Sequence, residues 1–214
     1  AIDGINGVFE KAEGVYTLED SISSLNSIIS LNMQHGGVTT GTKTGFEQFD
    51  AKGGLQKSDL IIVAGETSMG KSSLALTITR HAIENDAKIA FYSMEMTKEQ
   101  LAARMISAKT RIPANTILYS GSMSSEELKL IDEARGALPG NNLFFDDKST
   151  SNIDSILLSI RMMKLKSNID GAVVDYLQIL NVNSKNTSFS REQAMGDAAR
   201  RFKNLAKELG IWII

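Results

Sequence analysis

One run of the sequence combines residue types at a spacing that could hold phosphate. Residues 65–72 read GETSMGKS and match the pattern G-x-x-x-x-G-K-[ST]. Gly65 and Gly70 allow tight backbone turns in which consecutive N–H groups point at phosphate oxygens. Lys71 would place a cation beside the β- and γ-phosphates of a nucleotide, and the Ser72 hydroxyl could bind Mg²⁺. We therefore predict a site for ATP and Mg²⁺ whose nucleotide-binding residues are Gly65, Ser68, Met69, Gly70, Lys71, Ser72 and Ser73.

Two acidic residues occupy positions from which they could bind Mg²⁺ and activate water in such a site. Asp175 follows the apolar run 172–174, and a carboxylate at the end of a buried strand could hold Mg²⁺ together with Ser72. An aspartate at a strand end is also a common turn residue. Glu95 comes just after the strand that follows the helix of the phosphate loop, where it could orient and deprotonate the attacking water. The alternative for Glu95 is a solvated loop carboxylate. The predicted catalytic residues are Lys71, Glu95 and Asp175, and the predicted metal ligands are Ser72 and Asp175.

From residue 59 onward the sequence alternates the patterns of strands and helices. Short runs rich in apolar and β-branched residues predict strands at 60–64, 88–93, 143–145, 172–174 and 211–214. Helical patterns cover 71–85, 97–109, 124–135, 153–166 and 191–209. Thr97 and Gln100 have the spacing of a capping box, and Ser124 or Ser125 caps the next helix. This alternation predicts an α/β fold, a mainly parallel sheet with helices on both faces, whose strand carboxyl ends converge on the ligand.

The first part of the chain has a different pattern. Apolar residues recur there at spacings of three and four, as in an amphipathic helix over 17–34, and they are Leu18, Ile22, Leu25, Ile29 and Met33. Residues 38–57 are rich in Thr, Gly and Lys and are predicted to form a loop. We therefore divide the chain into a linker region, 1–37, and a nucleotide-binding domain, 38–214. The isolated helix must bury its apolar stripe on its own domain or on a neighbouring subunit.

Composition limits where the protein works and what it contacts. The 214 residues carry no cysteine, which excludes disulfides and cysteine-bound zinc and fits a reducing cytosol. No run approaches the ~20 apolar residues of a membrane-spanning helix, and no signal peptide opens the chain. We therefore expect a cytoplasmic protein without a membrane partner. The formal net charge is -2, so any positive surface for nucleic acid must be local, in loops or in a channel formed by several subunits.

Further motifs, in order and with compatible spacing, resemble the ATPase domain of the DnaB family of replicative helicases over residues 39–214. These motifs are TGFEQFD at 44–50, GGL at 53–55, SMEM at 93–96, the strand ending at 146–147, DYLQ at 175–178 and the helix at 191–209. Together with the phosphate loop they form a more specific set than a phosphate loop alone. The resemblance implies a RecA-like P-loop NTPase fold, ring hexamers with ATP bound between subunits, and 5′–3′ translocation on single-stranded DNA that unwinds the duplex.

The resemblance also implies roles for single residues and partners. Lys71 and Ser72 would hold phosphate and Mg²⁺, Asp175 would be the Walker B acid, and Glu95 the catalytic base. The helix at 17–34 would correspond to the linker helix that docks on the adjacent subunit. Other copies of the chain, single-stranded DNA, and a helicase loader or primase would be the partners.

The polar segment 181–190 follows the Walker B strand, and in the family such a loop faces the central channel. Lys185 and Arg191 could meet DNA phosphates there, although an ordinary solvated loop is the alternative.

The chain departs from the family pattern in three ways. Glu66 stands where relatives frequently carry a basic residue. The family's N-terminal domain is missing, and the phosphate-sensing glutamine and the arginine finger would lie beyond Ile214. A polypeptide limited to these residues is therefore expected to bind nucleotide poorly and to hydrolyse little of it. Two alternatives remain open: a strand-exchange recombinase or clock-type ATPase of the same fold, and a nucleotide-gated scaffold that binds ATP with little hydrolysis.

Overall fold

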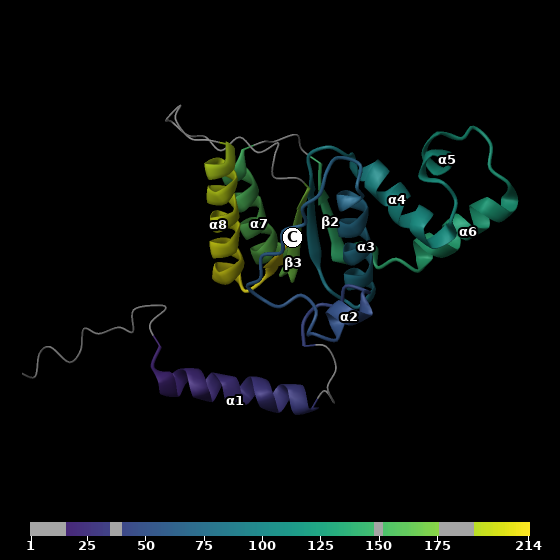
Figure 1. The fold of residues 1–214 in the computed structure, drawn as a ribbon. Helices are drawn as coiled ribbons and strands as arrows, with labels where there is room; N and C mark the ends of the chain where they lie inside the picture. The colour runs from purple at the N-terminus through teal and green to yellow at the C-terminus, as the bar shows by residue number, and fades with distance from the viewer. Residues whose placement is uncertain (1–15, 35–39, 148–151, 176–190) are drawn as a thin grey trace, which may run out of the picture. The chain divides into compact units, whose positions relative to one another are not determined.

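A computed structural model describes residues 16–34, 40–147, 152–175 and 191–214 (Figure 1). The chain divides into two compact units, Ala1–Thr40 and Gly41–Ile214. The first unit contains α1 (Leu18–Gln34), and the second contains every other described element. The predicted division between residues 37 and 38 lies close to this boundary.

Helix α1 starts with a local hydrogen-bond pair and has an exposed apolar side. The Asp20 N–H donates to Thr17 Oγ1 over 3.1 Å, and the Thr17 N–H donates to Asp20 Oδ2 over 3.0 Å, so each residue satisfies the other's backbone. The apolar side chains that the sequence placed on one stripe are exposed, from 46% for Ile29 to 78% for Leu18. Within the described part of its own unit, nothing covers this stripe.

The second unit is built on one parallel sheet. Its strands are β1 (Ile89–Ser93), β2 (Leu143–Asp146), β3 (Gly171–Asp175) and β4 (Trp212–Ile213), in the spatial order β2-β1-β3-β4. The helices are α2 (Glu47–Asp50), α3 (Lys71–Glu84), α4 (Lys98–Thr110), α5 (Ala114–Tyr119), α6 (Ser125–Gly136), α7 (Ile153–Ser167) and α8 (Arg191–Leu209), with a 3-10 turn at Gly140–Asn142. The chain passes from β1 to β2 on one side and then returns to β3 on the other side of β1. The order therefore reverses between β1 and β3, which is where such sheets bind ligands.

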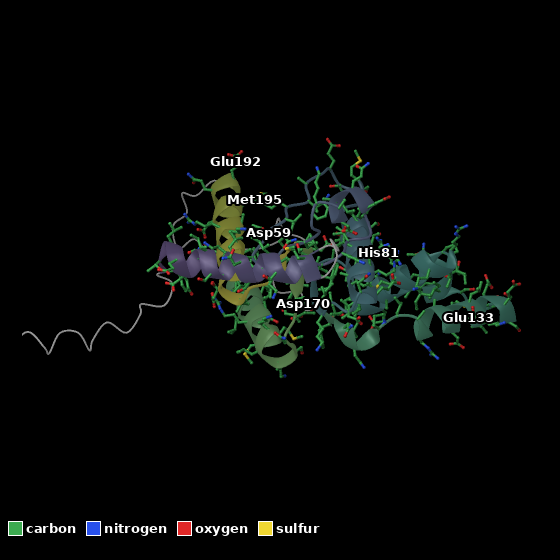
Figure 2. The ribbon with its side chains drawn as sticks, turned by 90° about the horizontal axis from the view of Figure 1, so that it is seen from below. Asp59, His81, Glu133, Asp170, Glu192 and Met195 are labelled. Atoms are coloured by element: carbon green, nitrogen blue, oxygen red, sulfur yellow. The ribbon has the colours of Figure 1, made fainter. Side chains whose placement is uncertain are left out.

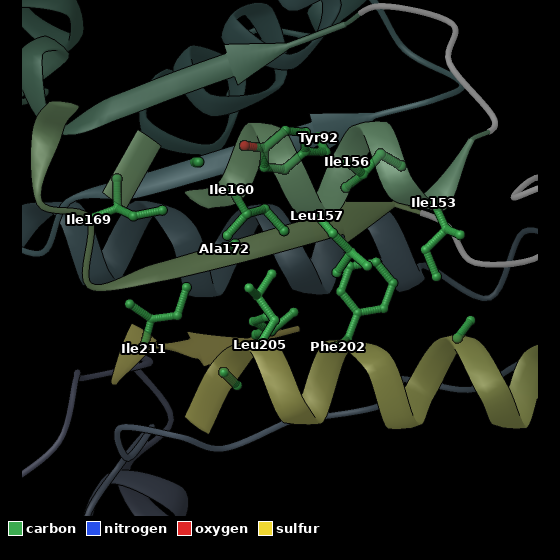
Figure 3. Packing of buried hydrophobic residues seen from close by; sticks show 14 residues of the cluster. Tyr92, Ile153, Ile156, Leu157, Ile160, Ile169, Ala172, Phe202, Leu205 and Ile211 are labelled. Atoms are coloured by element: carbon green, nitrogen blue, oxygen red, sulfur yellow. The ribbon is translucent and has the colours of Figure 1, made fainter. Parts of the chain in front are cut away.

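Alternate strand residues enter two separate cores, one on each face of the sheet. On one face, Ala90, Tyr92 and Ala172 pack against α7 and α8 (Figure 3). On the other face, Ile89, Phe91 and Val173 pack against α3 and α4. Because successive side chains of a strand point to opposite faces, strands of four or five residues supply both cores. The predicted α/β fold with helices on both faces of a parallel sheet is confirmed.

The predicted capping box of α4 is present, and the predicted serine cap of α6 is part of a second one. At the start of α4, the Gln100 N–H donates to Thr97 Oγ1, and the Thr97 N–H donates to Gln100 Oε1 over 3.0 Å. Ser124 and Glu127 form the same pair at the start of α6, which decides between Ser124 and Ser125 as the cap. These local bonds satisfy backbone N–H groups that the first helical turn leaves without partners.

The prediction of a strand at 60–64 is wrong beyond its first residues. Leu60 forms an isolated parallel bridge with Ile213, and the Ile61 N–H donates to the Ile213 oxygen over 2.8 Å. Beyond this bridge, residues 61–64 are not part of a strand. Ile62 is accordingly 61% exposed. An apolar run becomes a strand only where another strand accepts its hydrogen bonds.

The prediction of a continuous loop over 38–57 is also incomplete, because α2 lies within it. The Asp50 carboxylate accepts hydrogen bonds from the Thr44 N–H over 2.8 Å, the Thr44 hydroxyl over 2.7 Å and the Gly45 N–H over 3.0 Å. These bonds fold the segment back on itself. Four residues are too few to show a helical period in the sequence.

The amino ends of β1 and β3 are tied together by Asp170 (labelled in Figure 2). The Lys88 N–H donates to Asp170 Oδ2 over 2.8 Å, and the Asp170 N–H donates to the Lys88 oxygen over 2.7 Å. In the same strand pair, Ser93 lies opposite Asp175 at the carboxyl ends of β1 and β3. The two predicted acids of the site, Glu95 and Asp175, are thus brought to the same edge of the sheet.

Among the described helices, none is both long and apolar enough to cross a membrane.

Candidate active site

The predicted phosphate loop at residues 65–70 connects the segment that begins at Leu60 to the first turn of α3. Gly70 precedes that turn with φ +86°, in the left-handed region that favours glycine. Ser68 also has a positive φ, +67°, which is uncommon for a residue with a Cβ. Left-handed residues within a turn direct successive N–H groups to one side, which creates a concave surface for an anion. All residues from Gly65 to Gly70 are exposed, so a ligand can reach this surface.

The side chain of Lys71, which follows the loop, folds back onto the start of the loop. Its ammonium donates to the Gly65 oxygen over 3.0 Å and to the Glu66 oxygen over 2.8 Å. The cation is therefore held over the same loop whose N–H groups would meet phosphate.

Helix α3 offers its amino end to an anion. No side chain caps the first turn, and that turn contains no acidic residue. Ser72 and Ser73 lie in this turn, and Ser73 is exposed. The free N–H groups and the helix dipole both favour a negatively charged ligand at this end.

Asp175 is the last residue of β3 and is buried, with 7% of its surface exposed. Its Oδ2 atom is buried and has no hydrogen-bond partner among the described residues. A buried carboxylate oxygen without a partner is costly unless a ligand or cation compensates it. Lys71 and Asp175 line the same cavity, of about 150 Å³.

These residues fit a magnesium ion bound together with a nucleotide. Mg²⁺ usually keeps several waters and takes one or two carboxylates plus substrate phosphates, without a cage made only of protein ligands. The described residues contain no cluster of three or more His, Cys, Asp or Glu side chains that could hold a metal. The unpartnered oxygen of Asp175 and the hydroxyl of Ser72 are the donors that such an ion would use.

Glu95 lies just past the carboxyl end of β1. The Met94 N–H donates to the Asp175 oxygen over 2.9 Å, which continues the pairing of β1 and β3 to this point. The Met96 N–H then donates to Ser93 Oγ over 3.0 Å and turns the chain away from the sheet. Glu95 sits in this turn with its side chain exposed, and it has no hydrogen bond or ion pair within the described segments. An exposed carboxylate beside the switch point between β1 and β3 is available to a water molecule.

The predicted DNA contacts lie outside what the structure describes. Lys185 belongs to the segment that is not described, and Arg191 is the first residue of α8, with a side chain that is not described either.

Some residues of the site carried no signal in the sequence. Ala75, Met195 and Phe202 line the cavity that contains Lys71 and Asp175, and the last two come from α8 (Met195 is labelled in Figure 2). The helical period of 191–209 indicates that α8 has an apolar face. It does not indicate which part of that face meets the carboxyl end of β3.

Comparison with known proteins gives one family and several named relatives. The sequence model of the DnaB-like helicase C terminal domain matches residues 41–214. The chain is 31% identical to "Replicative DNA helicase DnaC" of Bacillus subtilis (strain 168) over 195 residues, 90% of this chain and 42% of that protein. It is 35% identical to "Replicative DNA helicase DnaB" of Helicobacter pylori (strain ATCC 700392 / 26695) over 205 residues, 94% of this chain and 41% of that protein. The chain thus spans about two fifths of the length of these relatives.

Solved structures agree at the level of the fold. One of them, an ATPase domain, has a TM-score of 0.80 and 25% identity, covering 90% of this chain and 69% of that one. A DnaB-like replicative helicase, described with its interactions with primase, has a TM-score of 0.77 and 24% identity, covering 94% of this chain and 48% of that one. The RecA-like fold that the resemblance implied is confirmed.

Proposed function

Because the chain belongs to the family of DnaB-like helicase C-terminal domains, we propose that it is the ATP-hydrolysing motor of a replicative DNA helicase. The observation that carries the proposal is the cavity shared by Lys71 and Asp175, in which a cation held over the phosphate loop lies with a buried, unpartnered carboxylate oxygen. A cation for phosphate and a carboxylate for Mg²⁺, at the switch point of a parallel sheet, form the basic requirement of a P-loop ATPase.

Each predicted residue has a distinct task in this proposal. The ammonium of Lys71 exchanges its two carbonyl partners for β- and γ-phosphate oxygens of ATP. The loop from Gly65 to Gly70 and the first turn of α3, with Ser72 and Ser73, bind the phosphates through backbone N–H groups. Ser72 and Asp175 hold Mg²⁺, which when bound neutralises charge on the phosphate oxygens.

Glu95 is the proposed general base. Its carboxylate accepts the proton of a water molecule as the water oxygen attacks the γ-phosphorus, and the bond from phosphorus to the β–γ bridging oxygen breaks. The exposed position of Glu95 past β1 leaves room for that water. Removal of the proton makes the water a better nucleophile, and positioning by Lys71 and Asp175 holds the phosphate chain for in-line attack.

The coupling to DNA is proposed at the level of the whole assembly. Copies of the chain form a ring hexamer with ATP between subunits, and the ring translocates on single-stranded DNA in the cytoplasm. Lys185 and Arg191 contact DNA phosphates at the channel, and a loader or primase is the protein partner. With a net charge of -2, the chain as a whole does not attract DNA, so the contacts must come from such local cations.

The decisive experiment, on the full-length protein, measures ATP hydrolysis with and without single-stranded DNA, followed by unwinding of a forked duplex. A helicase motor shows hydrolysis that DNA stimulates, together with strand separation that requires ATP. Hydrolysis and strand exchange without unwinding would instead support a recombinase. ATP binding with negligible hydrolysis, unchanged by DNA, would support a nucleotide-gated scaffold, and either result would overturn the proposal.

A further inference from the structure

Two neighbouring carboxylates stand at the end of β2, where Asp146 is the last residue of the strand and Asp147 follows it. Successive side chains of a strand point to opposite faces of the sheet, and these two contact helices on opposite faces. Asp146 Oδ2 accepts a hydrogen bond from Ser159 Oγ of α7 over 3.4 Å. Asp147 Oδ2 accepts one from the backbone N–H of Lys98, the first residue of α4, over 3.2 Å. The two acids therefore fasten the end of β2 to a different helix on each face.

Glu95 lies in the turn between β1 and α4, and this turn is fixed at its sheet end. The Met94 N–H donates to the Asp175 oxygen over 2.9 Å, and the Met96 N–H donates to Ser93 Oγ over 3.0 Å. The Met94 side chain packs against the core beside α7 and α8, and that of Met96 packs against the core beside α3 and α4. The Glu95 carboxylate itself has no hydrogen bond or ion pair in the described part of the chain, so its position depends on the backbone of the turn.

The other end of the turn is the start of α4, three residues after Glu95. The capping box of Thr97 and Gln100 satisfies backbone groups there, but it does not reach the sheet. Asp147 does connect the two, because its carboxylate accepts the Lys98 N–H and lies 3.8 Å from the Lys98 ammonium. The hydrogen bond from that N–H and the charge of the ammonium hold the pKa of Asp147 below its ordinary value. The first residue of α4 is therefore tied to the end of β2.

We propose that Asp147 is a positioning residue for Glu95, because it holds the start of α4 against the end of β2 and so sets where the Glu95 carboxylate lies relative to the γ-phosphate. The inference rests on the proposed function, in which Glu95 accepts the proton of the attacking water. A general base requires correct geometry first, and a displacement of about 1 Å can lower a rate by about a hundredfold. Asp147 contacts neither nucleotide nor water in this proposal, so its loss affects turnover and not ATP binding.

Steady-state hydrolysis by the full-length protein tests the contact from the side of the acid. In Asp147→Ala, kcat falls by about ten- to a hundredfold, while KM for ATP stays within about twofold. Asp147→Asn keeps a carbonyl oxygen that can accept the Lys98 N–H, and it restores kcat to within about threefold of the unaltered protein. Asp146→Ala, the matched control, removes the neighbouring carboxylate that bonds to α7 and leaves kcat within about twofold.

Variants of Lys98 test the same contact from the side of the helix. Lys98→Pro removes the N–H that Asp147 accepts, and proline is tolerated at the first position of a helix. Thr97 has φ -72° and ψ 160°, an extended conformation that a following proline favours. Lys98→Pro therefore lowers kcat as Asp147→Ala does. Lys98→Ala keeps the N–H and loses only the ammonium, so its kcat stays within about twofold.

A double-mutant cycle shows whether Asp147 acts through Glu95. In a Glu95→Gln background the base is already absent, so the addition of Asp147→Ala lowers the residual rate by no more than about twofold. A variant that merely folds less well loses rate equally in both backgrounds. The cycle therefore separates positioning from instability.

Three results would overturn the inference and leave the proposed function standing. They are an unchanged kcat in Asp147→Ala, equal losses of kcat in Asp147→Ala and Asp146→Ala, and fully additive effects of Asp147→Ala and Glu95→Gln. Normal hydrolysis in Glu95→Gln alone would instead remove Glu95 as the base, and the inference with it. Absence of hydrolysis by the unaltered full-length protein would overturn the proposed function itself.

Discussion

Lys71 donates to two carbonyl oxygens of its own loop, at 3.0 and 2.8 Å, and phosphate oxygens would have to replace both. The lysine ammonium has three N–H donors, which can serve either the loop carbonyls or the phosphates. Asp175 differs, because its buried Oδ2 has no hydrogen-bond partner among the described residues. The ammonium of Lys71 thus has hydrogen-bond partners within the chain, whereas one carboxylate oxygen of Asp175 has none among the described residues.

Lys71→Ala is expected to remove productive ATP binding. The variant loses the cation that the loop places on the phosphates, and a hydrogen bond to a charged group contributes about 1.5–3 kcal/mol. Titration calorimetry should show affinity lower by at least about tenfold, with an unchanged thermal unfolding temperature. Lys52→Ala, in an exposed turn, is the matched control. Equal ATP affinity in Lys71→Ala and the unaltered protein would refute the assignment of the phosphate loop.

Glu95→Gln is expected to separate binding from turnover. The amide cannot accept the proton of the attacking water, so hydrolysis should fall by about 10²–10⁴ while ATP and Mg²⁺ still bind. Steady-state hydrolysis and nucleotide titration, measured on the same preparation of the full-length protein, test this. Glu99→Gln, four residues later in the first turn of α4, should leave the rate within about twofold. Normal hydrolysis in Glu95→Gln would exclude Glu95 as the base.

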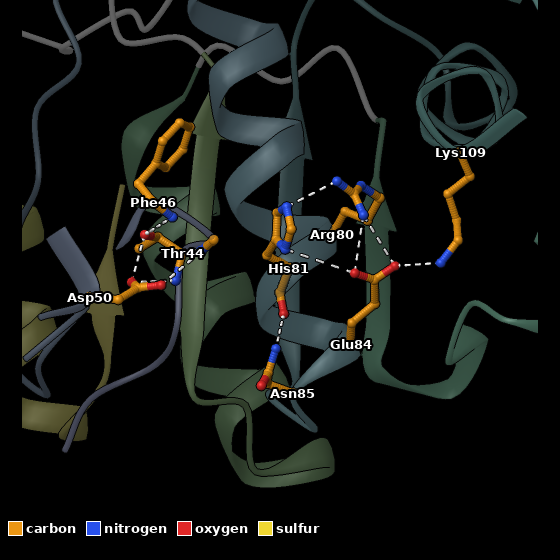
Figure 4. A network of polar contacts seen from close by, with 9 residues as sticks. Thr44, Phe46, Asp50, Arg80, His81, Glu84, Asn85 and Lys109 are labelled. Carbon is orange, nitrogen blue, oxygen red and sulfur yellow. Dashed lines mark hydrogen bonds and ion pairs between the residues drawn. The ribbon is translucent and has the colours of Figure 1, made fainter. Parts of the chain in front are cut away.

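Helices α3 and α4 are joined by one polar network. Glu84 near the end of α3 accepts hydrogen bonds from Arg80 and, over 2.6 Å, from the Lys109 ammonium near the end of α4 (Figure 4). Burial raises the pKa of Glu84, but the hydrogen bond from Lys109 and the charges of Arg80 and Lys109 outweigh burial and hold its pKa below the ordinary value. The network therefore joins α3, which begins at Lys71, to α4, which begins three residues after Glu95.

Glu84→Gln is expected to lower the free energy of unfolding by about 1–3 kcal/mol at neutral pH, since both cations lose a charged acceptor. A carboxylate whose pKa is depressed on folding stabilises the fold above its unfolded pKa, and this contribution disappears as pH falls through the folded pKa. The difference from the unaltered protein should thus shrink below about pH 4.5, the ordinary value for glutamate.

Urea unfolding at several pH values measures this difference. Glu133→Gln on α6, whose carboxylate lies 3.9 Å from Lys129 at an exposed site, should change stability by less than about 1 kcal/mol at any pH. A difference for Glu84→Gln that does not vary with pH would show that charge is not the cause.

The two units of the chain differ in how completely they bury their apolar side chains. The unit Gly41–Ile214 has a buried core on each face of its sheet, whereas the apolar stripe of α1 is exposed. A stripe of this kind on a helix requires a covering surface. We propose that a neighbouring copy of the chain supplies it, as expected for a ring.

Replacing Ile22 and Ile29 with Asp is expected to shift the assembly toward monomer while the ATPase unit stays folded. Both side chains are on the exposed stripe, and a charge there opposes burial against any apolar partner. Sedimentation velocity measures the assembly, and circular dichroism measures the fold. Ser23→Asp with Ser27→Asp adds the same charge on the other side of the helix and should leave assembly unchanged. Intact rings in the Ile22 and Ile29 variant would exclude a role for this stripe between subunits.

The sequence by itself determined the features that depend on local backbone chemistry. The glycines and Lys71 of residues 65–72, the capping box of Thr97 and the alternation of strand and helix all follow from short-range periods and hydrogen bonds. They were enough to predict the parallel α/β fold. They also placed Glu95 and Asp175 at strand ends.

Only the tertiary structure decided which distant segments meet. Periodicity shows that a segment has an apolar face, but not which surface covers it, so the approach of α8 to the cavity of Lys71 and Asp175 could not be predicted. Nor could the sequence show that Asp175 Oδ2 is left without a partner, or that Arg80 and Arg104 line a cavity between α3 and α4. The run 60–64 has the composition of a strand, yet its pairing in the described structure is a single bridge between Leu60 and Ile213, and composition alone does not show which backbone a run will pair with.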